Sequence, residues 1–307
     1  MTIQDFLKAY QKKEVNSFKN SSVEKPLVSV SIVTYQHVNY IKECLDGILM
    51  QKTNFPFEIL LGDDESTDGT REICLEYARK YPEKIRFFLH HRENNIKING
   101  APTGRFNFIY NLFTARGKYI ALCEGDDYWT DPLKLQKQVD FLEENEGYEG
   151  CFHSTYIKDE INKIEEKLWR DYTKCVFTIE DTLSKLSLFH TSSFLFKREN
   201  LLIPKWFTSI VSGDMALFAL IASNGLLYFI NEPMSVYRKN EGGVTNSLSL
   251  INYHTSRIEL FENLNKEFDF QYITTISAII SYHKNELKQC NESRLSHLIK
   301  RIQNKIK

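Results

Sequence analysis

The stretch that decides the fold is GKYIALCEGDDYW, residues 117–129. Its first six residues are, apart from Gly117 and Lys118, aromatic, β-branched or apolar, which predicts a short buried strand. Glu124, Asp126 and Asp127 follow at the carboxyl end of that strand, where open α/β sheets bind their ligands. Neighbouring carboxylates repel each other and favour a counter-ion, and hard oxygen ligands suit Mg²⁺ or Mn²⁺. The alternative is a solvated acidic turn ahead of a helix that begins near residues 130–132.

Composition limits the classes of protein to consider. The chain has 307 residues, 42% hydrophobic and 26% charged, which suits one large or two modest globular domains. A net charge of −1 gives no support to nucleic-acid binding. Six scattered cysteines without a CxxC pair predict reduced thiols in a cytoplasmic protein. The first 20 residues lack the apolar core of a signal peptide, and no apolar stretch is long enough to cross a bilayer.

Upstream of the acidic stretch, strand and helix patterns alternate. Strands are predicted at 27–34, 57–61 and 85–89, and helices at 41–51 and 71–81. This alternation predicts a parallel, doubly wound sheet with a ligand crevice at the carboxyl ends of its strands. Neither a GxGxxG after the first strand nor a GxxxxGK[ST] is present, so the NAD fingerprint and the P-loop are both absent.

A second acidic site ends the second predicted strand. Asp63 and Asp64 lie where a carboxylate could accept hydrogen bonds from a base or a ribose. Residues 66–70 are turn and N-cap residues, so a cap at 68–70 and a ligand contact at Asp64 are compatible. Arg105, at the start of a predicted helix, could neutralise a phosphate or could be ordinary solvated surface.

Three motifs in chain order, at residues 28–35, 63–70 and 117–127, together resemble the inverting family-2 glycosyltransferases of the GT-A fold. The resemblance runs from residue 27 to about residue 145. It implies an α/β, Rossmann-like mixed sheet flanked by helices. It also implies a nucleoside-diphosphate sugar as donor and a divalent cation, Mn²⁺ or Mg²⁺, as cofactor.

The resemblance assigns roles to particular side chains. Asp64 would bind the base, and the metal ligands would be Asp127, the more direct of the two, and Asp126. The whole predicted donor site consists of Val33, Thr34, Tyr35, Asp64, Arg105, Asp126, Arg238, Gly242 and Gly243. Relatives often have a histidine where this chain has Asn240, which argues against a histidine ligand at that position. Backbone N–H groups of the two glycines could cradle phosphate, and the alternative is a Gly-Gly turn.

Asp214 immediately precedes an apolar helix pattern. An acid there is favoured by the helix dipole, and the resemblance makes the same residue the catalytic base that deprotonates the acceptor hydroxyl. The two roles are compatible. Thr191 and Ser192 resemble a Thr/Ser step near the acceptor site of relatives, whereas His190 is expected to be structural.

The predicted organisation has three parts: an N-terminal helix and linker at 1–26, a GT-A catalytic domain at 27–247 and a helical region at 248–307. The catalytic domain divides into a sugar-nucleotide half, 27–150, and an acceptor half, 151–247. In the acceptor half, the highly charged residues 158–171 predict a solvated, exposed hairpin or loop, 177–188 predict a short helix and 190–196 predict a strand. The C-terminal region is predicted to hold helices at 253–268, 274–288 and 293–307. The last predicted helix, 293–307, is basic and amphipathic, so it could contact the inner face of a membrane, or pack on the domain or on another subunit of a homo-oligomer.

The expected activity is transfer of a sugar, with inversion, from a UDP-sugar or another nucleoside-diphosphate sugar to a hydroxyl of a glycan or lipid-linked glycan. The resemblance places this reaction in the synthesis of bacterial surface polysaccharides. One alternative is a non-catalytic module that binds a sugar nucleotide or a glycan. Another is a sugar-1-phosphate nucleotidylyltransferase, which should have a basic, glycine-rich loop where this chain has YQHVN at 35–39.

Overall fold

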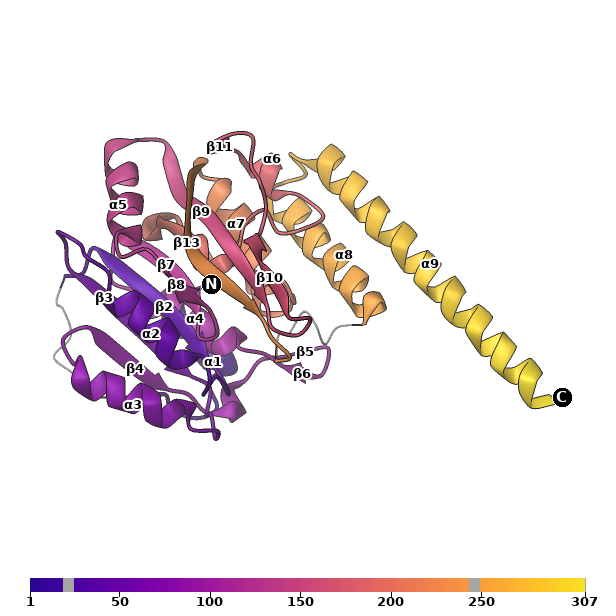
Figure 1. Ribbon diagram of the computed structural model, residues 1–307. Helices are drawn as coiled ribbons and strands as arrows, with labels where there is room; N and C mark the ends of the chain where they lie inside the picture. The colour runs from indigo at the N-terminus through magenta and orange to yellow at the C-terminus, as the bar shows by residue number, and fades with distance from the viewer. Residues whose placement is uncertain (19–24, 243–248, 307) are drawn as a thin grey trace.

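A computed structural model describes residues 1–18, 25–242 and 249–306, with side chains up to residue 292 (Figure 1). Within these ranges the centre of the molecule is a large mixed sheet with strand order β1-β4-β3-β2-β7-β12-β9-β13-β11. Helices lie on both faces of this sheet (Figure 1). The predicted mixed, helix-flanked α/β fold is therefore confirmed.

The first half of the sheet is parallel, as the alternating pattern predicted. Its strands are β2 (Val28–Thr34), β3 (Phe57–Asp63), β4 (Ile85–Leu89) and β7 (Tyr119–Glu124). The helices that connect them are α2 (Ile41–Leu49), α3 (Thr70–Lys80) and α4 (Arg105–Thr114). In the parallel register, Val33 lies beside Glu124 and Thr34 lies beside Asp63. The two acidic sites therefore meet at one edge of the sheet.

Two apolar cores cover the two faces of the sheet because side chains alternate along each strand. Val30 and Ile32 of β2 pack toward α2, α3 and α5 (Lys134–Glu144). Leu60 of β3 and Leu122 of β7 point to the opposite face, toward α4 and α7 (Gly213–Ala222).

The second half of the sheet is mostly antiparallel and holds the acidic stretch in place. Its strands are β8 (Tyr128–Trp129), β9 (Tyr148–Asp159), β12 (Leu195–Lys197) and β13 (Leu226–Lys239). Strand β12 joins β7 to β9, and β13 runs parallel to β9. Because β8 pairs with β13, the turn between β7 and β8 is fixed at both ends.

Shorter elements complete the fold. The remaining short helices are α1 (Ile3–Tyr10) and α6 (Ile179–Thr182), and the 3-10 turns are η1 (Arg92–Asn94), η2 (Thr191–Ser193), η3 (Arg198–Asn200) and η4 (Lys205–Thr208). The remaining strands are β1 (Asn16–Ser17), β5 (Lys97–Ile98), β6 (Ala101–Pro102), β10 (Ile164–Leu168) and β11 (Val176–Phe177). Strand β10 forms a hairpin with β9 in the charged segment where an exposed hairpin or loop was predicted.

Two predicted elements differ from the structure. The helix expected at 177–188 is only α6, because the hydroxyls of Ser184 and Ser187 bond nearby backbone carbonyls instead of continuing it. The strand expected at 190–196 begins as η2, where the Ser193 hydroxyl donates to the carbonyl of His190.

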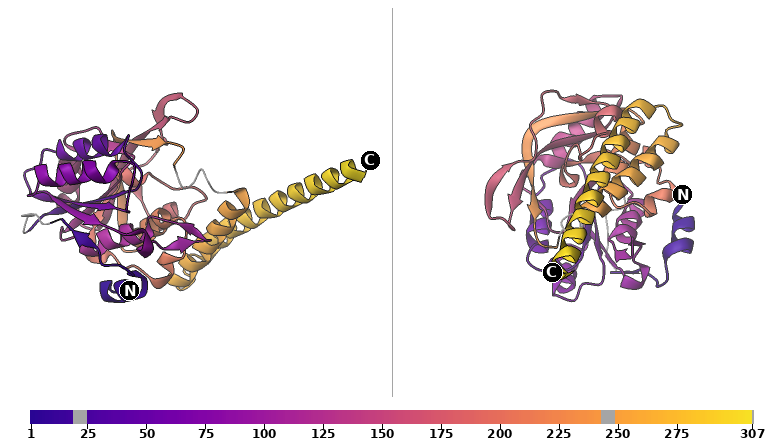
Figure 2. Two further views of the ribbon diagram at one scale, coloured as in Figure 1. Left: turned by 90° about the horizontal axis from the view of Figure 1, so that it is seen from below. Right: turned by 90° about the vertical axis from the view of Figure 1, so that its right-hand side faces the viewer.

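The C-terminal region is an antiparallel pair of helices, α8 (Leu250–Glu267) and α9 (Ile273–Ile306). The two helices predicted at 274–288 and 293–307 are one, because residues 289–292 contain neither glycine nor proline to end it. The end of α9 extends away from the sheet (Figure 2). The predicted membrane-facing side chains of this stretch lie outside the described part of the chain. None of the described helices has the length and apolarity needed to span a membrane.

Candidate active site

The turn after β7 brings three potential metal ligands together. The ligand atoms of Glu124, Asp127 and His190 all lie within 4.8 Å of one another. Asp127 is almost fully buried, and its Oδ1 accepts the backbone N–H of Arg238 at 2.9 Å. Its Oδ2 lies 3.7 Å from Nδ1 of His190. The histidine expected to be purely structural is thus part of the acidic cluster.

The electrostatics of this cluster call for a cation. Burial raises the pKa of Glu124 to about 8, and the charges of Asp126 and Asp214 add to the rise. Burial, followed by the charges of Asp126 and Glu124, raises the pKa of Asp127 well above its ordinary value. Oε2 of Glu124 is buried without a hydrogen-bond partner among the described residues. Two carboxylates and one imidazole, with one carboxylate oxygen that has no hydrogen-bond partner among the described residues, suit Mn²⁺ or Mg²⁺.

Asp126, the other predicted metal ligand, is not one of the three residues grouped here. Its Oδ2 accepts a hydrogen bond from Nδ2 of Asn240 at 2.9 Å and lies 3.9 Å from Nε2 of His37. Asn240 therefore contacts the acidic turn at the position where a histidine was expected from relatives.

Arg238 fixes the acidic turn through contacts of its side chain. Its guanidinium donates to the main-chain carbonyl of Asp126 at 2.7 Å and to the carboxylate of Glu43. It also stacks over the ring of Tyr128, with 4.3 Å between the guanidinium carbon and the ring centroid. The positive charge predicted to meet the donor is engaged by the protein itself.

The second predicted site, at the end of β3, is built around Asp64. Its buried Oδ2 accepts hydrogen bonds from Nη1 of Arg92 and Nδ2 of Asn95, both at 2.6 Å. Arg92 also lies over the ring of Tyr35, 4.0 Å from its centroid. Burial raises the pKa of Asp64, while Arg92 and Asn95 oppose that rise. The chain offered no periodic signal for Arg92 and Asn95, because they lie in a polar stretch between elements.

Close packing connects the two predicted sites through the end of β2. The hydroxyl of Thr34 lies 3.2 Å from Nδ1 of His37. A Cβ at Gly125 would come within 2.7 Å of Oγ1 of Thr34, so only glycine fits at this point of the acidic turn. Val33, the third predicted residue here, pairs with Glu124 in the sheet.

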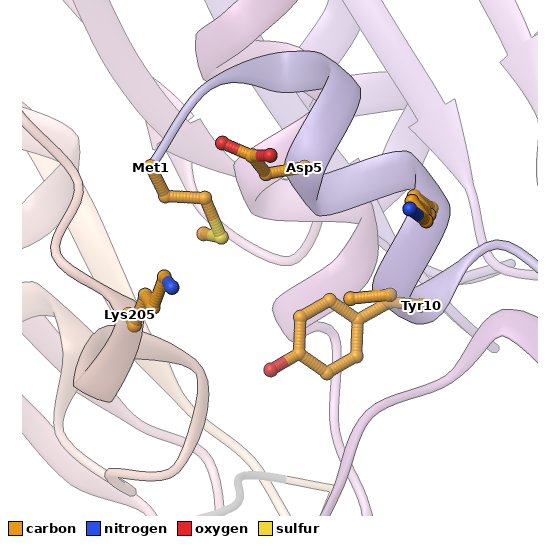
Figure 3. A pocket seen from close by; sticks show the side chains of 6 residues that line it. Met1, Asp5, Tyr10 and Lys205 are labelled. Carbon is orange, nitrogen blue, oxygen red and sulfur yellow. The ribbon is translucent and has the colours of Figure 1, made fainter.

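A groove of about 550 Å³ runs between these segments. Its lining consists of Tyr35, Gln36, His37, Tyr40, Glu160, Ile161, Lys163, Asn240, Glu241 and Gly242. Gly242 lines this groove, and its contact with phosphate stays a prediction, whereas Gly243 lies outside the described residues. A separate hollow of about 420 Å³ lies between α1 and η4, surrounded by Met1, Asp5, Tyr10 and Lys205 (Figure 3). It shares no lining residue with the groove.

Asp214, the predicted base, is half-buried in the first turn of α7. Its negative charge helps to raise the pKa of Glu124 and opposes the effect of burial on His190, whose pKa falls to about 4. The carboxylate therefore acts electrostatically on two members of the acidic cluster, although 90 residues separate it from Glu124 in the chain.

Arg105 supports the start of α7 instead of standing free at a phosphate site. Its guanidinium donates to the carbonyls of Ile210 at 3.0 Å and Val211 at 2.8 Å. A Cβ at Gly213 would lie 1.5 Å from its Nη1, so the arginine fills the space that this glycine leaves. Burial lowers the pKa of Arg105 to about 10, and the charge of Asp214 opposes that fall.

The Thr/Ser step at 191–192 supports His190. Both residues are buried, and the Ser192 hydroxyl lies 3.0 Å from Nδ1 of His190. The Ser192 carbonyl accepts the indole N–H of Trp129 at 3.0 Å. These contacts fix the histidine relative to the acidic turn.

Comparison with known sequences agrees with the geometry. The family model described as Glycosyl transferase family 2 matches residues 29–219. An uncharacterized protein of Mycobacterium tuberculosis is 35% identical over 226 residues, which make up 72% of this chain and 61% of that protein. This chain thus spans about three fifths of the length of that relative. The putative glycosyltransferase EpsE of Bacillus subtilis is 36% identical over 44% of this chain and 45% of its own length.

Solved structures share the fold at low sequence identity. Residues 1–349 of S. aureus TarS in complex with UDP-GlcNAc superimpose with a TM-score of 0.58 and 16% identity, covering 84% of this chain and 72% of that fragment. The mannosyltransferase PcManGT from Pyrobaculum calidifontis, in complex with GDP-Man and Mn²⁺, gives a TM-score of 0.56 and 16% identity, covering 94% of this chain and 82% of its own. These matches confirm the predicted GT-A-like fold. Because the family match covers more than half of the 307 residues, the chain belongs to glycosyl transferase family 2.

Proposed function

We propose that this protein transfers a sugar, with inversion and with the help of a divalent cation, from a nucleoside-diphosphate donor to an acceptor hydroxyl. The observation that carries the proposal is the group formed by Glu124, Asp127 and His190, whose ligand atoms lie within 4.8 Å of one another at the carboxyl end of β7. One end of this site suits a leaving diphosphate with its cation, and the other suits an acceptor that must lose a proton.

The donor groove is suited to a nucleoside at one end and phosphates at the other. Tyr35 offers an aromatic face, and the Asp64 carboxylate, oriented by Arg92 and Asn95, can accept an N–H of the base. The groove continues past His37 to Asn240, which both approach Asp126. A UDP-sugar is the proposed donor, since TarS is solved with UDP-GlcNAc in the same fold.

Glu124, Asp127 and His190 are the proposed ligands of Mn²⁺ or Mg²⁺, with the vacant Oε2 of Glu124 as one ligand atom. A cation bound there would stabilise the negative charge that develops on the departing nucleoside diphosphate. Arg238 keeps the turn in position through its hydrogen bonds to Asp126 and Asp127. The complex of PcManGT with GDP-Man and Mn²⁺ supports this assignment.

Asp214 is the proposed base. As the acceptor oxygen bonds to the anomeric carbon and the bond to the phosphate oxygen breaks, its carboxylate takes the hydroxyl proton. Attack on the face opposite the leaving group inverts the anomeric centre. Arg105 keeps the start of α7, which carries Asp214, in place through its hydrogen bonds to the carbonyls of Ile210 and Val211.

The catalytic unit is proposed to span residues 27–247, with the donor held mainly by 27–150 and the acceptor by 151–247. Residues 248–307 would form a helical extension. The acceptor is proposed to be a glycan or a lipid-linked glycan in polysaccharide synthesis. Support for the pathway comes from similarity to a putative teichuronic acid biosynthesis glycosyltransferase of Bacillus subtilis, which is 36% identical over 39% of this chain.

The test is release of nucleoside diphosphate from a panel of sugar nucleotides, with Mn²⁺, Mg²⁺ or EDTA. Wild type is compared with Asp127→Ala, Asp214→Asn and a surface control, Asp140→Asn on α5. Slow, metal-dependent release from one donor, lost in the first two variants and kept in the third, is the expected result. Calorimetry then separates binding from turnover, and failure to bind any sugar nucleotide would overturn the proposal.

A further inference from the structure

The turn between β9 and β10 forms an outer wall of the donor groove. Glu160, Ile161 and Lys163 of this turn line the groove, facing a set that includes Tyr35 and His37. The sequence pattern indicated only a solvated, charged segment here, and strand β10 is indeed exposed along its length. The turn is the part of the hairpin that reaches the site.

The turn is locked internally by Asp159. Its carboxylate accepts the backbone N–H of Asn162 and the Nδ2 of the same side chain, each at 2.9 Å. Lys239, at the end of β13, donates to the same carboxylate at 3.1 Å. These bonds define the path of the chain from Asp159 to Lys163.

Glu160 fixes the turn to two other elements. Oε2 of Glu160 accepts the hydroxyl of Tyr40, beside α2, at 3.1 Å, and Oε1 lies 3.7 Å from Nε of Arg238. The backbone N–H of Glu160 donates to the carbonyl of Lys239 at 3.1 Å. The turn is therefore held against both the α2 side and the β13 side of the groove.

Lys163 ends this turn in the left-handed region, with φ of 52°, a conformation that L-residues adopt mainly in turns. Among the residues that line the groove it is the one lysine or arginine. Within the described part of the chain, no ion pair or hydrogen bond engages its ammonium group. Arg238, by contrast, is committed to Glu43 and to the acidic turn.

We infer that Lys163 binds the diphosphate of the donor from the outer wall of the groove. The inference rests on the proposed function. A nucleoside diphosphate that extends from Tyr35 toward the acidic turn brings its phosphate oxygens into the groove that Lys163 lines. A lysine ammonium is a compact point charge that suits phosphate, and the locked turn reduces the entropy lost on binding.

The test is calorimetry with UDP and GDP, and with uridine and guanosine as phosphate-free probes, in the presence of Mn²⁺. Wild type is compared with Lys163→Gln, Lys163→Glu and a control on the same hairpin, Lys167→Gln in exposed β10. We expect about tenfold weaker binding of the preferred diphosphate in Lys163→Gln and a larger loss in Lys163→Glu. Nucleoside binding, and all binding by Lys167→Gln, should stay as in wild type.

Two results would overturn the inference alone. Wild-type affinity for the diphosphate in Lys163→Glu would show that the ammonium makes no contact with phosphate. An equal loss for nucleoside and diphosphate would show that the substitution only disturbs the groove. If wild type binds neither diphosphate, the proposed function itself fails, and the role of Lys163 fails with it.

Discussion

Two pairs of adjacent aspartates end strands of the same sheet, and the protein neutralises only one of them with its own cations. In the first pair, Nε of Arg71 lies 2.5 Å from Asp63 and Nη1 of Arg92 lies 2.6 Å from Asp64. Each carboxylate has an arginine partner, although Oδ1 of Asp63 is buried without a hydrogen bond among the described residues.

The second pair is treated differently. Among the described contacts, the carboxylates of Asp126 and Asp127 meet Asn240, two histidines and a backbone N–H. Within this pair, the guanidinium of Arg238 contacts only the main-chain oxygen of Asp126. The cluster around Asp127 therefore has too little positive charge of its own. Burial of its carboxylates in the ionised form costs free energy unless a bound metal cation compensates their charge. We therefore propose that the same dipeptide serves base recognition where arginines neutralise it and metal binding where they do not.

The largest expected effect separates the pairs by metal binding. Asp127→Asn should weaken Mn²⁺ binding by about 100-fold or more, because it removes a charged ligand from a three-ligand cluster. Asp63→Asn should leave Mn²⁺ binding unchanged. Calorimetric titration of both variants checks the difference, and Asp127→Asn binding Mn²⁺ as wild type does would contradict the proposed cluster.

The free energy of unfolding, in contrast to Mn²⁺ binding, should depend strongly on the first pair of aspartates. Asp63→Asn should lower the free energy of unfolding by about 3 kcal/mol, because Arg71 loses the buried carboxylate that compensates its charge. Glu143→Gln, which breaks the exposed pair with Lys118, should cost less than about 1 kcal/mol. Urea unfolding measures both values. Equal costs would mean that the arginine at the first pair is not needed for folding.

Measurement of nucleoside binding tests the proposed role of the first pair. Arg92→Gln should weaken binding of the free nucleoside by about three- to tenfold, because Asp64 loses its charged partner and Tyr35 loses the guanidinium over its ring. The matched control is Lys97→Gln, an exposed cation on the same connection before α4. Calorimetry with the nucleoside of the preferred donor is the measurement. Tighter binding in Arg92→Gln would mean that the arginine competes with the base.

The smallest expected effect is thermal. Mn²⁺ at about 100 times its dissociation constant should raise the Tm of wild type by about 5 °C, since ligand binding stabilises the folded state by mass action. The Asp127→Asn variant should show no shift. Differential scanning calorimetry with and without EDTA records both, and a Tm that ignores Mn²⁺ in wild type would count against an intrinsic metal site.

The sequence predicted the elements whose signals are local. Strand β4 was placed at 85–89, as observed, because strand-forming residues and turn residues alternate through this half of the chain. The Asp64 and Asp127 positions followed from their places at strand ends. The sequence did not predict which residues contact these two aspartates. Arg92 is 28 residues from Asp64 and His190 is 63 residues from Asp127, and both belong to polar stretches without periodicity.

The contact between Arg105 and Gly213 bears on how this protein could be recombined with its relatives. An arginine from the proposed donor half occupies the space that a glycine leaves in the proposed acceptor half. A chimera joined near residue 150 would take the residue at position 105 from one parent and the residue at position 213 from the other. Exchange of acceptor specificity between relatives should therefore move both positions as a unit, because a side chain larger than glycine at 213 would displace the helix that carries the proposed base.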